Sequence, residues 1–95
     1  MSDTITAAVA ALNEKLDGSF DGMAKFDILD EGSIIIDANG ARAGDDDAEV
    51  TLSADADTFR AILGGDLDPT TAFMSGKLKV DGDMGAAMRL ASVIG

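Results

Sequence analysis

Residues 65–85 read GDLDPTTAFMSGKLKVDGDMG, and this stretch predicts a short helix, a turn, one strand, a second turn and a last helix. Asp68 before Pro69 marks a helix start, because the carboxylate can accept hydrogen bonds from unpaired N–H groups and proline suits the first helical position. Gly76 ends that helix where a left-handed backbone is needed. Residues 77–80 alternate between polar and apolar, so two apolar side chains share one face of a strand. The stretch lacks catalytic residue types and suggests an enclosure for something apolar.

The same region resembles a known family. The matching motifs are Asp68-Pro69, Ala72-Phe73-Met74, Gly76-Lys77-Leu78-Lys79-Val80, Gly82-Asp83-Met84-Gly85 and Ala87-Met88-Arg89-Leu90. Together they are similar to the C-terminal signature of the sterol carrier protein 2 domain, and the order of elements expected along the whole chain fits that family. The resemblance implies a domain that binds and moves lipids without doing chemistry on them.

The composition argues against an enzyme. With 95 residues the chain is expected to form one domain over residues 1–95. It contains no cysteine, histidine, tyrosine or tryptophan, which removes disulfides, the commonest general base and the commonest transition-metal ligand. We therefore expect no catalytic residue, no metal site and no cofactor.

The charge balance excludes one large class of partner. The formal net charge is −11, from 18 acidic and 7 basic residues. Nucleic-acid binding needs the opposite sign, since affinity comes mostly from neutralising phosphates, and anionic membranes are disfavoured for the same reason. Two interpretations of the acidic surface stay open: it serves solubility, or it docks a basic partner.

Targeting signals are not evident. The start of the chain lacks a basic segment, and no apolar run approaches the roughly 20 residues that span a bilayer. The last residues, Ser92-Val93-Ile94-Gly95, are not a peroxisomal address. The expectation is a cytoplasmic protein without stable membrane insertion, and a bacterial source would fit.

Periodicity predicts the other elements. A helical stripe is formed by Ile5, Val9, Leu12 and Leu16. Alternation predicts strands at 20–29, 33–38, 41–44 and 48–55, with Asn39-Gly40 as the strongest hairpin signal. Tight turns suggest that these four strands form an antiparallel meander.

The expected fold class is α+β, with the element order α-β-β-β-β-α-α-β-α. Strands grouped before helices favour a single, mainly antiparallel five-stranded sheet with helices on one face, enclosing an apolar tunnel. The other face is expected to be polar and exposed. The late strand at 77–81 joins the sheet from a distance, because a lone strand cannot satisfy its backbone.

The last helix, residues 84–94, is apolar nearly all round. One stripe holds Met84, Ala87, Met88, Ala91 and Ile94, and another holds Ala86, Leu90 and Val93. Such a helix is normally buried, yet a small domain cannot easily cover every side of a terminal helix. Three interpretations stay open: ordinary core, a lid over a ligand, or a dimer surface.

These observations predict a lipid site. Its floor is expected from Phe26, Ile28, Val50 and Leu52, its wall from Phe59, Ile62, Phe73 and Met74, and its lid from Met84, Met88 and Ile94. Lys77, Lys79 and Arg89 are candidates for contact with an acidic headgroup, or else a solvated face that protects an edge strand.

The expected function is binding or transfer of a long apolar ligand: fatty acid, acyl-CoA, phospholipid or a sterol-like molecule. The alternative is a non-enzymatic accessory module that docks on a lipid- or quinone-synthesis enzyme through its last helix. The chain would act as a monomer, or as a dimer through that helix.

Overall fold

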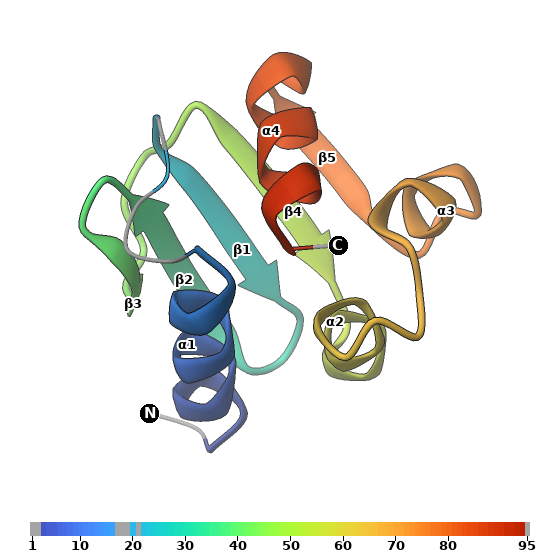
Figure 1. Cartoon of the computed structure of the whole chain (residues 1–95), viewed down its shortest axis with the longest axis horizontal. Helices are drawn as coiled ribbons and strands as arrows, with labels where there is room; N and C mark the ends of the chain where they lie inside the picture. Colours follow the sequence, from blue (N-terminus) through green and yellow to red (C-terminus); the bar gives the residue numbers. More distant parts are fainter. Residues whose placement is uncertain (1–2, 17–19, 21, 95) are drawn as a thin grey trace.

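The computed structural model describes residues 3–16, 20 and 22–94. The elements are α1 (Asp3–Leu16), β1 (Ala24–Ile28), β2 (Gly32–Asp37), β3 (Gly40–Ala43), β4 (Val50–Ala54), α2 (Ala56–Leu63), α3 (Pro69–Met74), β5 (Lys79–Gly82) and α4 (Met84–Ile94). Figure 1 shows α1, α2 and α4 on one face of the sheet, with α3 beside the start of β5. This order and the α+β class are as predicted.

The sheet has the strand order β3-β2-β1-β4-β5. Three of its pairs are antiparallel, β1 with β2, β2 with β3 and β4 with β5, whereas β1 and β4 are parallel. The predicted five-stranded, mainly antiparallel sheet is confirmed. The predicted meander of the first four strands is wrong, because β4 pairs with β1 and not with β3. Alternation reports which face a residue occupies, and carries no information about which strand lies alongside.

One row of apolar residues crosses the whole sheet on its inner face. The register aligns Ala43, Ile34, Phe26, Leu52 and Val80 from one edge to the other. The Phe26 ring meets Phe59 of α2 edge-on, with ring centroids 4.8 Å apart. Buried residues of α1 and α4, including Leu12 and Leu90, complete the core over this row. The inner face of the sheet is therefore mostly core.

The chain between β3 and β4 crosses the outer face of the sheet. It must return along the sheet because β3 and β4 run in the same direction on opposite sides of β2 and β1. Asp45 of this crossover pairs with Lys25 of β1 at 2.9 Å. Ile35 is fully buried on the outer face, and a Cβ at Gly44 would lie 3.3 Å from its side chain. The expectation of a wholly polar, exposed outer face is thus wrong at Ile35, which the crossover covers.

The free edge of β3 is occupied by a side chain from α1. The Asn13 amide donates to the Ala41 carbonyl at 3.0 Å and accepts from the Ala41 N–H at 2.8 Å. Asn13 therefore satisfies both outward backbone groups of Ala41, as a neighbouring strand would.

Element bounds differ from the sequence expectation mainly at strand ends. The first strand is shorter than predicted, and β5 begins two residues later than the predicted start at Lys77. The last helix has the predicted bounds, 84–94. The sequence also predicts Ser2 or Asp3 as the cap of the first helix and Gly18 as its stop; Ser2 and Gly18 lie outside the described residues.

Gly82 of β5 generates the first testable prediction. Its φ is 116°, and an added Cβ would collide with the Glu49 carbonyl and lie 2.9 Å from the Val50 Cα. We expect Gly82→Ala to lower the free energy of unfolding by about 2–5 kcal/mol, from positive-φ strain together with a backbone clash.

Gly76→Ala is the matched control, since Gly76 also has positive φ, 82°, but has open space where a Cβ would lie. It should cost only about 1–2 kcal/mol. Urea denaturation of both variants measures the difference, and equal losses would mean that β5 does not approach β4 as closely as described.

Candidate functional site

Helix α4 divides into a core side and an uncovered side. Ala86, Ala87, Leu90 and Ile94 are buried, and the two alanines let the helix backbone approach the sheet closely. Met84 and Met88 lie on the other side, where they are 46% and 68% exposed. Large apolar side chains left open on one helix face indicate a surface that contacts something outside the core.

Helix α3 supplies a second set of exposed apolar side chains. It begins as predicted: Asp68 is the N-cap, its Oδ1 accepts a hydrogen bond from the Thr70 N–H at 2.8 Å, and Pro69 opens the first turn. Pro69 and Ala72 are buried, which turns Phe73 and Met74 outward, 43% and 80% exposed. The short helix thus presents its largest side chains to solvent.

An apolar hollow of about 290 Å³ lies between α3, β5 and α4. Its floor is formed by the sheet edge, and its two sides by the exposed faces of the helices. The lining residues are Leu52, Pro69, Thr70, Phe73, Met74, Leu78, Val80, Met84, Ala87, Met88 and Ala91. The volume of this apolar hollow is close to the lower limit of small-ligand sites, about 300 Å³.

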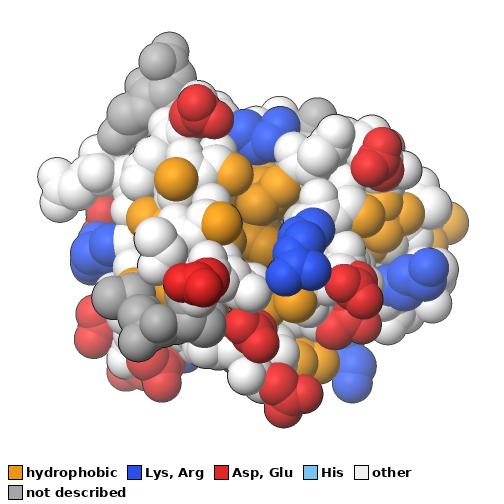
Figure 2. Space-filling view, turned by 90° about the horizontal axis from the view of Figure 1, so that it is seen from below, with side chains coloured by type: hydrophobic (Ala, Val, Ile, Leu, Met, Phe, Trp, Pro, Cys, Tyr) orange, Lys and Arg blue, Asp and Glu red, His pale blue; other side chains and the backbone are white. Residues whose placement is uncertain are grey.

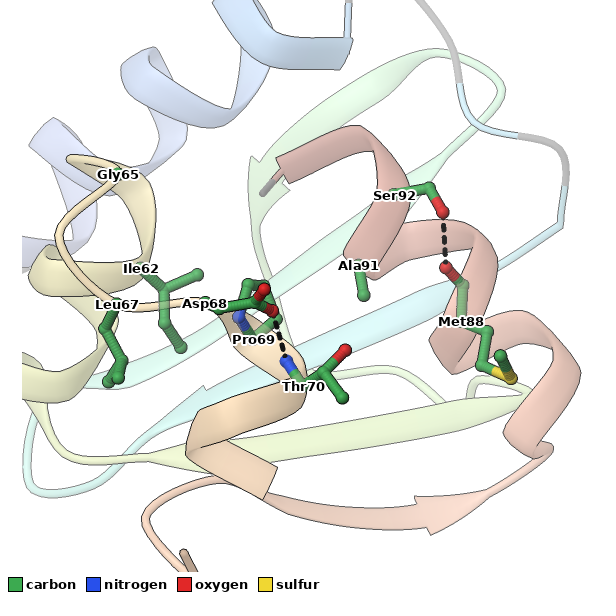
Figure 3. A pocket seen from close by; sticks show the side chains of 9 residues that line it. All are labelled: Ile62, Gly65, Leu67, Asp68, Pro69, Thr70, Met88, Ala91 and Ser92. Carbon is green, nitrogen blue, oxygen red and sulfur yellow. Dashed lines mark hydrogen bonds between the residues drawn. The ribbon is translucent and has the colours of Figure 1, made fainter. Parts of the chain in front are cut away.

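A second, more polar hollow of about 410 Å³ adjoins it between α4 and the segment that joins α2 to α3. The polar hollow is lined by Ile62, Gly65, Leu67, Asp68, Pro69, Thr70, Met88, Ala91 and Ser92. Pro69, Thr70, Met88 and Ala91 line both hollows, so the two lie side by side. We call them together the α3–α4 groove. In Figure 3 the side chains of Asp68 and Thr70 extend from the start of α3 toward α4, and the Ala91 side chain points back toward them.

The three predicted headgroup cations do not line this groove. Lys79 aligns with Ser53 in the row on the outer face of the sheet. The pKa of the Asp55 carboxyl is lowered mainly because Thr58 donates hydrogen bonds to it, and Lys77 also contributes to the lowered pKa. Arg89 lies 3.8 Å from the Glu49 carboxylate. Among the described lining residues of the groove, Asp68 is the one ionisable side chain.

The predicted lipid contacts fall into three groups, of which the third is Phe59 alone. The groove brings together Leu52, Ile62, Phe73, Met74, Met84 and Met88. Phe26, Ile28, Val50 and Ile94 are instead fully buried core residues and line neither hollow. Leu78 and Val80 line the apolar hollow but were not among the predicted contacts. Their position on one face of the predicted strand could have indicated that they belong to the site. The sequence analysis also did not predict Asp68, Thr70 and Ser92 as groove residues, because only the fold brings the start of α3 and the end of α4 together.

Phe59 lines a different hollow, of about 340 Å³, between α1 and α2. Three alanines of α1, with Arg60 and Leu63 of α2, form its other walls. Figure 2 views this end of the molecule and shows apolar side chains exposed among charged ones. This hollow does not share residues with the α3–α4 groove.

The groove offers binding surface more than reactive chemistry. Within the described part of the chain, no cluster of three or more potential metal ligands occurs. None of the helices formed by these residues is long and apolar enough to cross a membrane. What the groove provides is apolar area with three oxygen-bearing side chains, Asp68, Thr70 and Ser92, at one end.

Comparison with known proteins gives a consistent result. A family model described as the SCP-2 sterol transfer family matches residues 4–95. Hydroxysteroid dehydrogenase-like protein 2 of Xenopus laevis is 33% identical over 103 residues, which cover 100% of this chain and 25% of that protein. The chain thus spans about a quarter of the length of this relative.

Solved structures agree on the fold. Sterol carrier protein 2 of Aedes aegypti, in a complex with the C16 fatty acid palmitate, has a TM-score of 0.78 at 25% identity, covering 99% of this chain and 96% of that one. Sterol carrier protein 2 like 2 from Aedes aegypti also has a TM-score of 0.78, at 21% identity and 96% coverage of both chains. The resemblance noted in the sequence is confirmed.

Two residues on opposite sides of α4 generate the second prediction. Leu90→Ala should lower the free energy of unfolding by about 2–5 kcal/mol, because it opens a cavity in the core. Met88→Ala should change it by less than about 1 kcal/mol, since most of the Met88 side chain is already in water. Thermal or urea denaturation checks both, and a large loss for Met88→Ala would show that Met88 is core.

Proposed function

The chain belongs to the SCP-2 sterol transfer family, and from this premise we propose that it binds a long-chain apolar lipid in the α3–α4 groove. The observation that carries the proposal is the exposure of Phe73, Met74, Met84 and Met88 around one hollow. Leaving such side chains in water is unfavourable, and an apolar ligand lying between them would remove that cost.

The groove suits a ligand that is recognised by its apolar length. Burying one methylene is worth about 0.8 kcal/mol, so a sixteen-carbon chain gains roughly 13 kcal/mol before losses. Lost motional freedom and imperfect fit remove much of this gain. Three of the four exposed side chains are methionines, which repack around irregular shapes and so accept varied chains. Broad affinity for apolar chains, with modest selectivity along the chain, is the expected behaviour.

The comparison with solved structures also favours a ligand with a long apolar chain. The Aedes aegypti relative holds palmitate, an acyl chain of the length considered above. For this chain the candidates are fatty acid, acyl-CoA, phospholipid and sterol-like molecules. We propose that the domain holds and transfers such a ligand without reacting with it, because the groove lining lacks a nucleophile activated by a base.

The third prediction tests occupancy of the groove. The protein should bind an uncharged, environment-sensitive dye such as Nile red with a blue-shifted, enhanced emission, and native mass spectrometry should detect bound lipid. Met88→Trp should fill the space between α3 and α4 and reduce dye binding about tenfold or more, while the protein stays folded.

Val93→Trp is the matched control, because Val93 is also partly exposed on α4 but lines neither hollow. It should bind dye like the unchanged protein. If both tryptophan variants bind normally, the groove is not the lipid site. If the protein binds no lipid and forms a dimer that Met88→Trp breaks, the exposed face of α4 is a protein interface, and the lipid-binding proposal fails.

A further inference from the structure

The polar end of the α3–α4 groove has an unusual charge for a site that would accept a fatty acid. The described residues of its lining include one carboxylate, Asp68, and two hydroxyl groups, Thr70 and Ser92, but no lysine or arginine. The apolar hollow adds no charged residue of either sign. A ligand whose apolar chain occupies the apolar hollow would therefore place its polar end beside a negative charge.

The Asp68 carboxylate has one oxygen occupied and one available. Its Oδ1 accepts the Thr70 N–H at 2.8 Å, which secures the carboxylate at the start of α3. Within the described residues, the other oxygen, Oδ2, takes part in none of the hydrogen bonds or ion pairs found. An ionised carboxylate is purely an acceptor, so its free oxygen favours a ligand group that donates a hydrogen bond.

The two hydroxyl groups accept as well as donate. Ser92 donates its hydroxyl hydrogen to the Met88 carbonyl at 3.1 Å, which leaves the oxygen of Ser92 as an acceptor. The Thr70 hydroxyl can rotate and serve in either role. A ligand hydroxyl could therefore donate to Asp68 and accept from Thr70, whereas a ligand carboxylate offers no hydrogen to Asp68.

The positively charged side chains Lys77, Lys79 and Arg89 do not line the groove. Arg89 faces Glu49, and Lys79 lies in the outer-face row of the sheet. Lys77 is close enough to Asp55 to contribute to the lowered pKa of that carboxyl, after the larger contribution of Thr58. The Thr70 N–H at the start of α3 is not available to an anion either, because it donates to Asp68.

We infer that the groove selects lipids whose polar end is an uncharged group with an O–H donor, and that Asp68 disfavours lipids ending in a carboxylate. Long-chain alcohols and other hydroxyl-bearing neutral lipids fit this chemistry. The inference rests on the proposed function and adds the headgroup class, with Asp68 as the residue that determines it.

The test uses two ligands with the same twelve-carbon chain, dodecanol and laurate, below their aggregation limits. Each competes with Nile red on the unchanged protein and on Asp68→Asn. An ionised acid binds an apolar site more weakly than an alcohol for reasons unrelated to Asp68. The informative quantity is therefore the dissociation constant of laurate divided by that of dodecanol. Asp68→Asn should reduce that ratio by about 3- to 10-fold, because it removes a like charge beside the acid.

Two controls make the change specific. Asparagine is as good an N-cap as aspartate, so Asp68→Asn should melt close to the unchanged protein. Asp46→Asn alters the net charge equally but lies in the crossover between β3 and β4, and it should leave the ratio unchanged. Raising NaCl from about 20 to about 500 mM should also reduce the ratio in the unchanged protein, and should have a smaller effect in Asp68→Asn.

A third ligand tests the hydrogen bond. Dodecyl methyl ether lacks an O–H donor yet is more apolar than dodecanol, so weaker binding of the ether would support donation to Asp68. The inference would be overturned if the ratio for Asp68→Asn stayed within about twofold of the ratio for the unchanged protein. It would also be overturned if the ether bound better than the alcohol. These results leave lipid binding itself intact. If none of the three ligands displaces the dye, the proposed function fails instead.

Discussion

The parallel pairing of β1 with β4 is the constraint on which the rest of the structure depends. It separates β4 from β3, its neighbour in sequence, and sends residues between them across the outer face of the sheet. It also aligns Phe26 with Leu52, which continues the apolar row toward β5. Because β4 already pairs with β1, its other side is open to β5, and the last quarter of the chain gathers at that edge.

The groove follows from how α4 covers this edge. Alanines at positions 86 and 87 let α4 lie close to the sheet, and Leu90 and Ile94 insert into the core. The methionines of the same helix then extend past the core over β5. On the other side α3 is too short to cover β5, and its Phe73 and Met74 face outward. The sheet edge is thus flanked by two apolar walls, and none of the elements formed by the described residues lies between them.

Local patterns in the sequence were sufficient for elements whose signals are local. The Asp68-Pro69 start, the positive φ at Gly76 and the bounds of the last helix depend on neighbouring residues only. The meander was wrong because strand order depends on residues far apart in the chain, and alternation is the same for either neighbour. The lining of the groove also depends on residues far apart in the chain, so local patterns could not predict all of it. Phe26 and Leu52 occupy the same inner row, yet only Leu52 reaches the groove, since the helices above decide which part of the row is covered.

The pair of hydrogen bonds between Asn13 and Ala41 also bears on how the protein can assemble. A fibril that grows by strand addition needs two open sheet edges on every molecule, so that each new copy offers another edge to the next. Here the β3 edge is already occupied at its middle by a side chain of the same molecule. Strand addition at β5 would join two copies and then stop, because each would present only its closed edge. A single amide side chain on α1 thereby blocks the β3 edge at Ala41 to strand addition by a second copy.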